Sequence, residues 1–537
     1  MRPLILLSGF LAALAVLSPA GFRQLHAQEA RRPNILFIFC DDLTCQAISA
    51  YGESRQLLQT PNMDRLAAEG VRFDRCLVTN SICGPSRATI LTGKYSHRNG
   101  FYNNSNSKFD SSQQTFVRLL QQSGYQTGIV GKWHLVSDPV GFDFWHILPG
   151  QGLYYNPPMI RNGEKVNQPG YVTDIVTDLS VEWLKNRDRS KPFLLMSQHK
   201  APHREWAPPL RHLGWDKDRK YPEPPTLFDD FAGRSRAVSD HDMGLDRTFT
   251  ELDAKLRPAP NMTPEQLAEW NAYYEPRNAE FLAAKPEGRD LVRWRYNRYM
   301  HDYLACVKAV DESVGRMLQA LDEAGETDNT VVVFSSDQGF FLGEHGWFDK
   351  RWIFEESLRT PLMVRWPKVA EAGAVRREIV SLVDFAQTFL DIAGVEAPAD
   401  MQGRSILPLL KGPAPDDWRK SLYYHYYEYP VPHRVRPHVG VITDRYKLVH
   451  YYKPDVDDWE LLDRQVDPLE TQDFYKDPSY SQIVADLKQE LERLRVEVGD
   501  DQPTPRFAYG NQPFENEPQP QPQPQPEPKN KTKTRKK

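Results

Sequence analysis

The sequence predicts an α/β fold in which helices cover a large central sheet, mixed but mostly parallel, and a smaller antiparallel sheet with a helix follows. Three observations predict this fold. From residue 33 onward, short and continuously apolar runs alternate with helical patterns, which is typical of strands buried on both faces. Past about residue 415, short aromatic runs separated by turn residues replace this pattern. Polar, chemically capable residues also follow the apolar runs, where open α/β sheets bind ligands.

The elements of the large sheet are expected in strand-then-helix order. Continuous apolar runs predict strands at residues 34–39, 126–130, 192–196 and 330–334. Helical patterns predict helices at residues 115–123 and 290–325. The longer helix carries apolar residues at spacings of three and four, so we expect one of its faces to pack on a core.

Two further segments complete this organisation. Residues 207–290, rich in Pro, Trp and charge, predict an insertion or cap beside the site, with a helix beginning near Thr263. Aromatic strands and a closing helix are expected at residues 423–429, 439–443, 446–450, 459–462 and 483–496. We therefore expect a main domain over residues 31–415 and a C-terminal subdomain over residues 416–500.

Neither end of the chain is expected to belong to a folded domain. Arg2 precedes a short apolar run, and small residues follow up to Ala20 and Ala27, which predicts a secretory signal peptide over residues 1–27. An uncleaved membrane anchor is the alternative. Residues 501–537 are rich in Pro and Gln and then in Lys, which predicts a disordered tail. We expect a secreted or periplasmic protein with no membrane span after signal removal.

The composition excludes several classes of protein. The 537 residues carry 67 Lys and Arg against 72 Asp and Glu, and a net charge of −5 is too small and of the wrong sign for a nucleic-acid binder. A mean hydropathy of −0.61 excludes a polytopic membrane protein. Five cysteines in so long a chain do not form a disulfide framework, and their odd number leaves at least one thiol unpaired.

The most specific motif is the run CGPSRATILTG at residues 83–93. It resembles the signature of the sulfatase family of the alkaline phosphatase superfamily, Cys-x-Pro-Ser-Arg followed by Thr-Gly, and the rest of the family pattern follows over roughly residues 33–500. The chain looks most similar to bacterial carbohydrate sulfatases, such as those that remove the 6-sulfate of N-acetylglucosamine. The resemblance implies that residues 31–415 are the catalytic domain. It also implies that a formylglycine-generating or anaerobic sulfatase-maturating enzyme oxidises Cys83 to formylglycine.

These residue types suit the hydrolysis of a sulfate monoester. The reaction needs a nucleophile, positive groups that hold the sulfuryl oxygens, and an acid for the leaving alcohol. A plain thiol at Cys83 would leave a stable thiosulfate ester, whereas hydrated formylglycine has one hydroxyl to attack sulfur and a second to expel sulfate. A small buried hydrophobe is the alternative for Cys83.

Two pairs of residues with oxygen-bearing side chains predict a metal site. Asp41-Asp42 follows the first predicted strand, and Asp337-Gln338 follows the last strand of the large sheet. These side chains supply oxygen ligands only, which suits a hard cation such as Ca²⁺ better than zinc. The family resemblance implies that Ca²⁺ is bound by Asp41, Asp42, residue 83, Asp337 and Gln338. Many relatives have Asn or His in place of Gln338. For an isolated Asp-Asp pair, a helix cap or a solvated turn is the alternative.

The resemblance also implies catalytic roles. Arg87 would hold the formylglycine hydroxyl, and Lys132 and Lys350 would bind the sulfate. His134 resembles the histidine that assists the elimination regenerating the aldehyde. His203 resembles the one that protonates the leaving oxygen.

An outer substrate pocket is expected from four more residues. His199 is the second candidate for protonating the leaving oxygen, and it is grouped here with Lys200, Arg436 and His438 as substrate-binding. These side chains could reach a sugar or its acidic substituents. For Arg436 and His438, an ordinary solvated strand and loop is the alternative.

We therefore expect a Ca²⁺-dependent formylglycine sulfatase that hydrolyses sulfate monoesters of a sulfated sugar or glycan, such as a glycosaminoglycan. A phosphatase or phosphonate monoester hydrolase of the same superfamily is one alternative, because it would use a similar metal and nucleophile. A non-catalytic glycan-binding protein with unmodified Cys83 is the other.

Overall fold

The computed structural model describes residues 31–452 and 455–510. The predicted signal peptide and residues 511–537 of the predicted tail lie outside the described residues. The described fold belongs to one compact unit that begins at Arg32. Within the described ranges, no helix is both long and apolar enough to cross a membrane.

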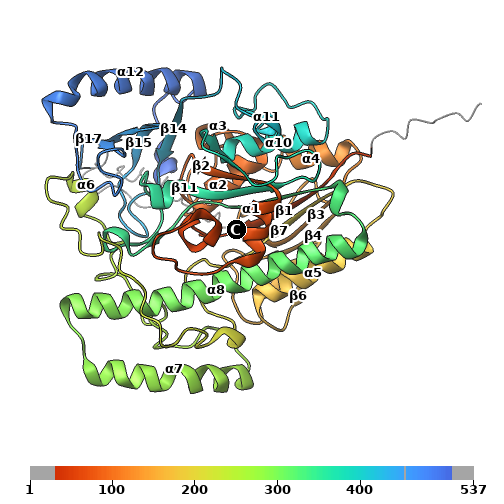
Figure 1. Ribbon diagram of the computed structural model, residues 1–537, viewed down its shortest axis with the longest axis horizontal. Coiled ribbons are helices and arrows are strands. Elements are labelled where there is room, and N and C mark those ends of the chain that lie inside the picture. Colours follow the sequence, from red (N-terminus) through yellow and green to blue (C-terminus); the bar gives the residue numbers. More distant parts are fainter. Residues whose placement is uncertain (1–30, 453–454, 511–537) are drawn as a thin grey trace, which may run out of the picture. The chain divides into compact units, whose positions relative to one another are not determined.

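Eleven strands form the central sheet, in the order β12-β2-β11-β8-β1-β7-β3-β4-β5-β6, with β13 beside β2 (Figure 1). The neighbours β8, β1, β7, β3 and β4 run parallel to one another. In contrast, β11 runs antiparallel to β8 and β2, and β5 and β6 fold back as an antiparallel edge. The sheet is therefore mixed and mostly parallel, as predicted. Its strands are β1 Asn34–Cys40, β2 Val71–Leu77, β3 Gln126–Lys132, β4 Phe144–Leu148, β5 Pro158–Arg161, β6 Glu164–Asn167, β7 Phe193–Gln198, β8 Thr330–Ser336, β11 Arg359–Arg365, β12 Ala374–Arg376 and β13 Val380–Ser381.

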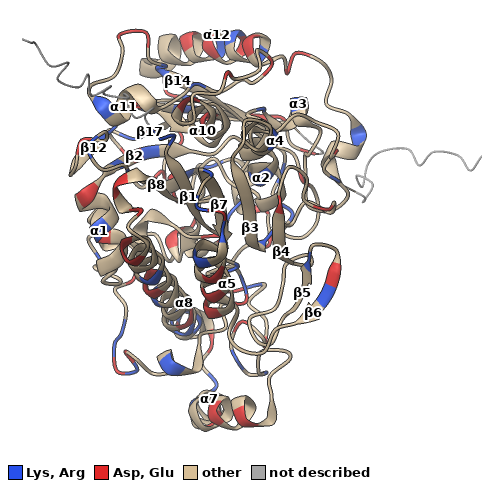
Figure 2. Ribbon diagram, turned by 90° about the vertical axis from the view of Figure 1, so that its right-hand side faces the viewer, with Lys and Arg blue, Asp and Glu red and all other residues tan. Residues whose placement is uncertain are grey.

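The side chains of β1 divide between two cores. Ile35, Phe37 and Phe39 lie in one core with residues of α2, α4 and α10, whereas Leu36 and Ile38 lie in the other with residues of α1, α5 and α8. Alternate residues of a strand point to opposite faces, so helices cover both faces of the sheet (Figures 1 and 2). The helices are α1 Pro61–Glu69, α2 Cys83–Thr92, α3 Ser96–Asn99, α4 Phe116–Gln122, α5 Val172–Asn186, α6 Arg236–Ser239, α7 Pro264–Ala284, α8 Gly288–Ala324, α9 Glu355–Leu358, α10 Phe385–Ile392, α11 Leu407–Lys411 and α12 Ser481–Val498.

A separate antiparallel sheet follows in the order β14-β15-β16-β17, and α12 packs on it. Leu487, Leu491 and Leu494 of α12 share a core with Val441 and Leu448 of the sheet. Their spacing of four and three residues places them on one face of the helix, so the predicted sheet-plus-helix arrangement is confirmed. The remaining strands are β14 Ser421–Tyr426, β15 His438–Thr443, β16 Tyr446–Tyr451, β17 Asp458–Asp463, and the two-residue pair β9 Phe341–Leu342 and β10 Phe348–Asp349.

The segment expected as an insertion contains α6 and α7. The hydroxyl of Thr263 accepts a hydrogen bond from the Gln266 backbone N–H, and the Gln266 side chain accepts one from the Thr263 N–H. This reciprocal cap fixes the start of α7 where the sequence predicts it. α7 lies beside α8 on the side away from the central sheet (Figures 1 and 2).

The apolar patterns missed several strands of the central sheet. β2 interleaves Arg72, Asp74 and Arg75 with its apolar residues, and β5 and β6 are four-residue strands with mainly exposed or half-buried side chains. Pro361 interrupts β11, where the register with β2 shifts. None of these segments is a continuous apolar run, which is why the antiparallel part was not located.

Gly131 of β3 packs directly against the backbone of β7. Gly131 has a φ of +101°, and a Cβ at this position would overlap the backbone carbonyl oxygen of Gln198. Replacing it therefore strains the backbone and separates the two strands.

We predict that Gly131→Ala destabilises the fold by roughly 2–5 kcal/mol, measured by urea unfolding. Gly150→Ala is the matched control, because Gly150 also has a positive φ, of +55°, and a Cβ added there would meet nothing within 4 Å. It is expected to cost about 1 kcal/mol. Equal losses in the two variants would contradict the steric explanation.

Candidate active site

The predicted site residues gather at one end of four adjacent parallel strands. Asp41 and Asp42 follow β1, and Asp337 and Gln338 follow β8. Lys132 ends β3, and the segment that carries His199 and His203 follows β7. Because parallel strands end at the same edge of a sheet, side chains far apart in sequence become neighbours here.

Three buried carboxylates form the centre of the cluster. Carboxylate oxygens of Asp41, Asp42 and Asp337 lie within 4.8 Å of one another. The backbone of Asp42, with a φ of +67°, donates from its N–H to Asp337 Oδ1 at 3.1 Å. Its carbonyl accepts from the Tyr303 hydroxyl of α8 at 2.8 Å. The turn after β1 is therefore fixed both by β8 and by α8.

The same carboxylates fit an oxygen-coordinated cation. Within the described residues, Asp41 Oδ1 and Gln338 Oε1 are buried without a hydrogen-bond partner. An unpartnered buried oxygen is costly, and a hard cation would satisfy both atoms. Gln338 also donates to Asp42 Oδ1 at 2.5 Å, so the amide is oriented with its oxygen free.

Three cations surround the carboxylates: Lys132, Lys350 and Arg87. The Lys132 ammonium pairs with Asp41 and donates to Gln151 Oε1 at 2.5 Å. The Lys350 ammonium lies 2.6 Å from Asp42 Oδ2. Burial alone would lower the pKa of Lys350, but Asp42 and other nearby negative groups outweigh it and raise the pKa, so this lysine stays charged.

Arg87 lies on α2 and joins three strands. Its Nη2 donates to Asp337 Oδ2 at 3.0 Å, and its Nη1 donates to Gln198 Oε1 at 2.7 Å and to the Lys132 carbonyl at 2.9 Å. Gln198, at the end of β7, was missed by the sequence patterns although its position after an apolar run could have indicated it. Gln151 was also missed, and its loop carries no such signal.

Cys83 is the first residue of α2 and is fully buried. The Gln338 amide nitrogen lies 3.8 Å from its Sγ. Burial raises the pKa of the thiol to about 12, against the opposing effect of Lys350. The unmodified thiol is therefore protonated at neutral pH and is a poor nucleophile.

The two catalytic histidines are placed differently. His203 lies with Nε2 3.8 Å from Asp42 Oδ2, and its Nδ1 is 2.5 Å from the Arg204 carbonyl. A carbonyl only accepts, so Nδ1 carries the hydrogen, and Nε2 faces the cluster with its lone pair in the neutral ring. His134 has a φ of +57°, and its Nδ1 is buried without a hydrogen-bond partner among the described residues. Burial, reinforced by Lys132, lowers the pKa of both histidines.

Three predicted substrate contacts have their partners elsewhere. His199 Nε2 lies 3.1 Å from the Ser313 hydroxyl of α8. Arg436 is fully buried and ion-paired with Asp240 at 2.7 Å. His438 is also fully buried, and its Nδ1 is 2.8 Å from the Arg436 carbonyl. The alternative of a solvated strand and loop at Arg436 and His438 does not fit this burial. The contacts of these three residues also lie outside the cluster, where the substrate-binding expectation would place them.

A pocket of about 390 Å³ opens beside His203. Lys200 and Gln151 line it, and the Lys200 ammonium lies 4.9 Å from the centroid of the Tyr154 ring. Burial lowers the pKa of Lys200 to about 8. Because Gln151 also contacts Lys132, this pocket adjoins the cluster.

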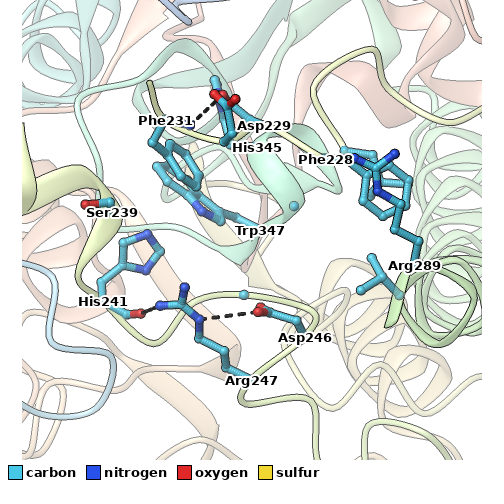
Figure 3. A pocket seen from close by; sticks show the side chains of 15 residues that line it. Phe228, Asp229, Phe231, Ser239, His241, Asp246, Arg247, Arg289, His345 and Trp347 are labelled. Atoms are coloured by element: carbon cyan, nitrogen blue, oxygen red, sulfur yellow. Dashed lines mark hydrogen bonds and ion pairs between the residues drawn. The ribbon is translucent and has the colours of Figure 1, made fainter. Parts of the chain in front are cut away.

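A second pocket, of about 420 Å³, contains none of the cluster residues (Figure 3). His345 pairs with Asp229 at 2.7 Å, and Arg247 donates to the His241 carbonyl at 2.7 Å. Arg247 also pairs with Asp246 at 3.3 Å. His345 and Arg247 of this pocket thus already have partners among the residues that line it.

The fold and cluster combine an α/β sheet with a buried cysteine, a candidate carboxylate cation site and two lysines beside it, which is the kind of arrangement that an enzyme acting on an anionic ester needs. The sulfatase family model matches residues 33–395, and a model of the C-terminal part of N-sulphoglucosamine sulphohydrolase matches residues 343–497. The chain belongs to the sulfatase family and is a sulfuric ester hydrolase.

Relatives agree with this assignment. The N-acetylglucosamine-6-O-sulfatase of Bacteroides thetaiotaomicron is 48% identical over 517 residues, which cover 92% of each chain. A solved structure of a protein in complex with its substrate D-glucosamine-2-N,6-O-disulfate is also 48% identical, with a TM-score of 0.86, and covers 88% of this chain and 99% of that one. The phosphonate monoester hydrolase of Agrobacterium radiobacter, at 20% identity and a TM-score of 0.66, shares the fold over 87% of this chain and 96% of its own.

The carboxylate cluster predicts stabilisation by calcium. Free Ca²⁺ at 100 times its Kd is expected to stabilise the chain by about 2.7 kcal/mol, seen as a higher melting temperature. Asp337→Asn is expected to reduce this shift strongly, because it removes a carboxylate from the cluster. Asp246→Asn, which changes an exposed carboxylate of the second pocket, should keep it. Equal shifts in the two variants would contradict the site.

Proposed function

We propose that the chain hydrolyses the 6-sulfate ester of a glucosamine or N-acetylglucosamine unit in a sulfated carbohydrate. The observation that carries this proposal is the convergence of Cys83, Lys132 and Lys350 on three buried carboxylates. The substrate class is supported by the activity named for the 48% identical relative and by the ligand of the 48% identical solved structure.

Residue 83 would act as formylglycine. The protonated thiol that the burial of Cys83 produces supports a need for this modification. Once formed, the hydrate offers one hydroxyl for attack on sulfur, which displaces the sugar oxygen. Deprotonation of the second hydroxyl would then expel sulfate by breaking the bond between the sulfated oxygen and the formylglycine carbon, which restores the aldehyde. Arg87 lies four residues further along α2, one turn away, and would hold the attacking hydroxyl.

Asp41, Asp42, Asp337 and Gln338 would hold Ca²⁺ together with residue 83. The bound cation would supply positive charge to the nucleophile and to a sulfate oxygen. As these carboxylates turn to the cation, Lys132 and Lys350 would exchange their carboxylate partners for sulfate oxygens. Two ammonium groups in a dry site stabilise the charge that develops on the transferring group.

His203 would protonate the leaving sugar oxygen, since its Nε2 faces the cluster and it lines the pocket of about 390 Å³, through which the substrate would enter. The negative charge of a bound sulfate would raise the His203 pKa toward the value that an acid needs. His134 would accept the proton when the aldehyde is restored, because its ring is held neutral by burial.

Secretion and maturation complete the proposal. The predicted signal peptide at residues 1–27 supports a secreted or periplasmic location. Modification of Cys83 would require a formylglycine-generating or anaerobic sulfatase-maturating enzyme in the producing cell.

The modification has a direct test. The tryptic peptide that contains residue 83 is expected to be lighter than its cysteine form, by mass spectrometry. Cys83→Ala is expected to lower sulfate release from N-acetylglucosamine 6-sulfate by roughly 10⁴–10⁶-fold, because it removes the nucleophile. Cys45→Ala, at another buried cysteine, serves as the control and should retain activity. Unmodified Cys83 in a fully active protein would contradict the mechanism.

The roles of the two histidines after β7 can be separated. His203→Gln is expected to lower kcat on sugar sulfates by roughly 10²–10⁴-fold. The loss should be smaller on aryl sulfates, because a phenolate can leave without being protonated. His199→Gln should mainly lower stability, because its partner is Ser313 of α8. A larger loss of kcat in His199→Gln than in His203→Gln would contradict this assignment and make His199 the residue that protonates the leaving oxygen.

A further inference from the structure

A large cavity lies between α7, α8 and the loop that precedes them. It has a volume of about 680 Å³ and is lined by residues of all three segments. Phe281 of α7 stacks on Trp294 of α8, with ring centroids 3.7 Å apart. The Tyr274 hydroxyl donates to Asp302 Oδ1 at 2.6 Å, so the two helices are tied together around the cavity.

The cavity is lined by Arg298, one guanidinium nitrogen of which is buried without a hydrogen-bond acceptor among the described residues. Arg298 is only 9% exposed, and in the part of the chain that the structure describes its Nη1 has no hydrogen-bond partner. Its guanidinium lies over the rings of Trp294, at 5.0 Å, and Tyr274, at 5.2 Å. A buried donor without an acceptor is costly, so a ligand anion would satisfy it.

The rest of the lining is aromatic and of mixed charge. Six Lys or Arg side chains face four Asp or Glu side chains around the cavity. Some of these are already paired, such as Arg293 with Glu223 at 2.9 Å. Arg277 lies 3.9 Å from the centroid of the Tyr273 ring, and both line the cavity. Aromatic faces suit the C–H face of a sugar ring, and carboxylates accept hydrogen bonds from its hydroxyls.

We propose that the cavity between α7 and α8, hereafter the α7–α8 pocket, binds an acidic sugar unit of a glycan, with Arg298 on its carboxylate or sulfate group. A pyranose with one or two anionic groups matches both kinds of side chain, because its hydroxyls can donate to the carboxylates and its anionic groups can accept from the guanidinium.

The α7–α8 pocket is distinct from the catalytic cluster. On α8, Tyr303 reaches Asp42, whereas Arg298 and Asp302 line the pocket. None of the cluster residues lines it. Sugar binding here therefore holds a glycan at a second position and takes no part in the hydrolysis, so it can be measured without turnover.

The binding test uses the full chain carrying Cys83→Ala, titrated by calorimetry with a fully sulfated heparin tetrasaccharide. We expect two classes of site, one at the cluster and one at the α7–α8 pocket. Adding Arg298→Met, which keeps an apolar stem but removes the guanidinium, should weaken the second class at least about tenfold. Arg316→Met removes a cation from an exposed ion pair on the same helix and should leave both classes unchanged.

Arg277→Gln provides a second variant, because Arg277 is half-buried and its loss leaves the contact between α7 and α8 in place. It should also weaken the second class, and the neutral sugar chitotetraose should bind this class at least about tenfold more weakly than the sulfated one. In a chain with Cys83 intact, Arg298→Met should leave kcat/KM for N-acetylglucosamine 6-sulfate within about twofold.

Three results would overturn the proposal: the absence in Cys83→Ala of any class of site that Arg298→Met weakens, equal binding by Arg298→Met, Arg277→Gln and Arg316→Met, or chitotetraose binding as tight as that of the sulfated sugar. Failure of the proposed hydrolysis would appear instead as absent sulfate release in the unmodified sequence, with the second class of site still present.

Discussion

The structure depends on one arrangement, in which three carboxylates and three cations are buried together at the ends of the central strands. Removing so many charges from water is costly, and the cost is offset only when each group keeps a well-placed partner. Here Asp41 pairs with Lys132, Asp42 with Lys350, and Asp337 with Arg87. Neighbouring strands, α2 and α8 hold these pairs in register.

This arrangement also explains how one site can receive a cation and an anion. Under the proposed function, Asp41 and Asp42 would hold Ca²⁺, and the Lys132 and Lys350 ammonium groups that they now neutralise would be free to hold a sulfate. Asp41 Oδ1 and Gln338 Oε1, buried without hydrogen-bond partners in the described chain, are two oxygens that such a cation would satisfy. The burial that keeps the Cys83 thiol protonated likewise supports the proposal that the working nucleophile is a modified residue.

Much of this could be predicted from the sequence. Apolar runs located β1, β3, β7 and β8, and the polar residues after them located most of the cluster, because strand polarity brings their ends to one edge. The antiparallel strand β11 was not predicted, because Pro361 interrupts its run of apolar residues. Gln151 lies in a loop without periodicity. The contacts of His199 with Ser313 and of Arg436 with Asp240 join residues more than a hundred positions apart in the sequence. Such contacts follow from the tertiary arrangement, which short motifs do not encode.

The most direct measurement is a crystal structure of the Cys83→Ala chain with Ca²⁺ and N-acetylglucosamine 6-sulfate. The account predicts the cation among Asp41, Asp42, Asp337 and Gln338, with sulfate oxygens within hydrogen-bond distance of the Lys132 and Lys350 ammonium groups. A sulfate bound elsewhere, with both lysines still paired to Asp41 and Asp42, would contradict it.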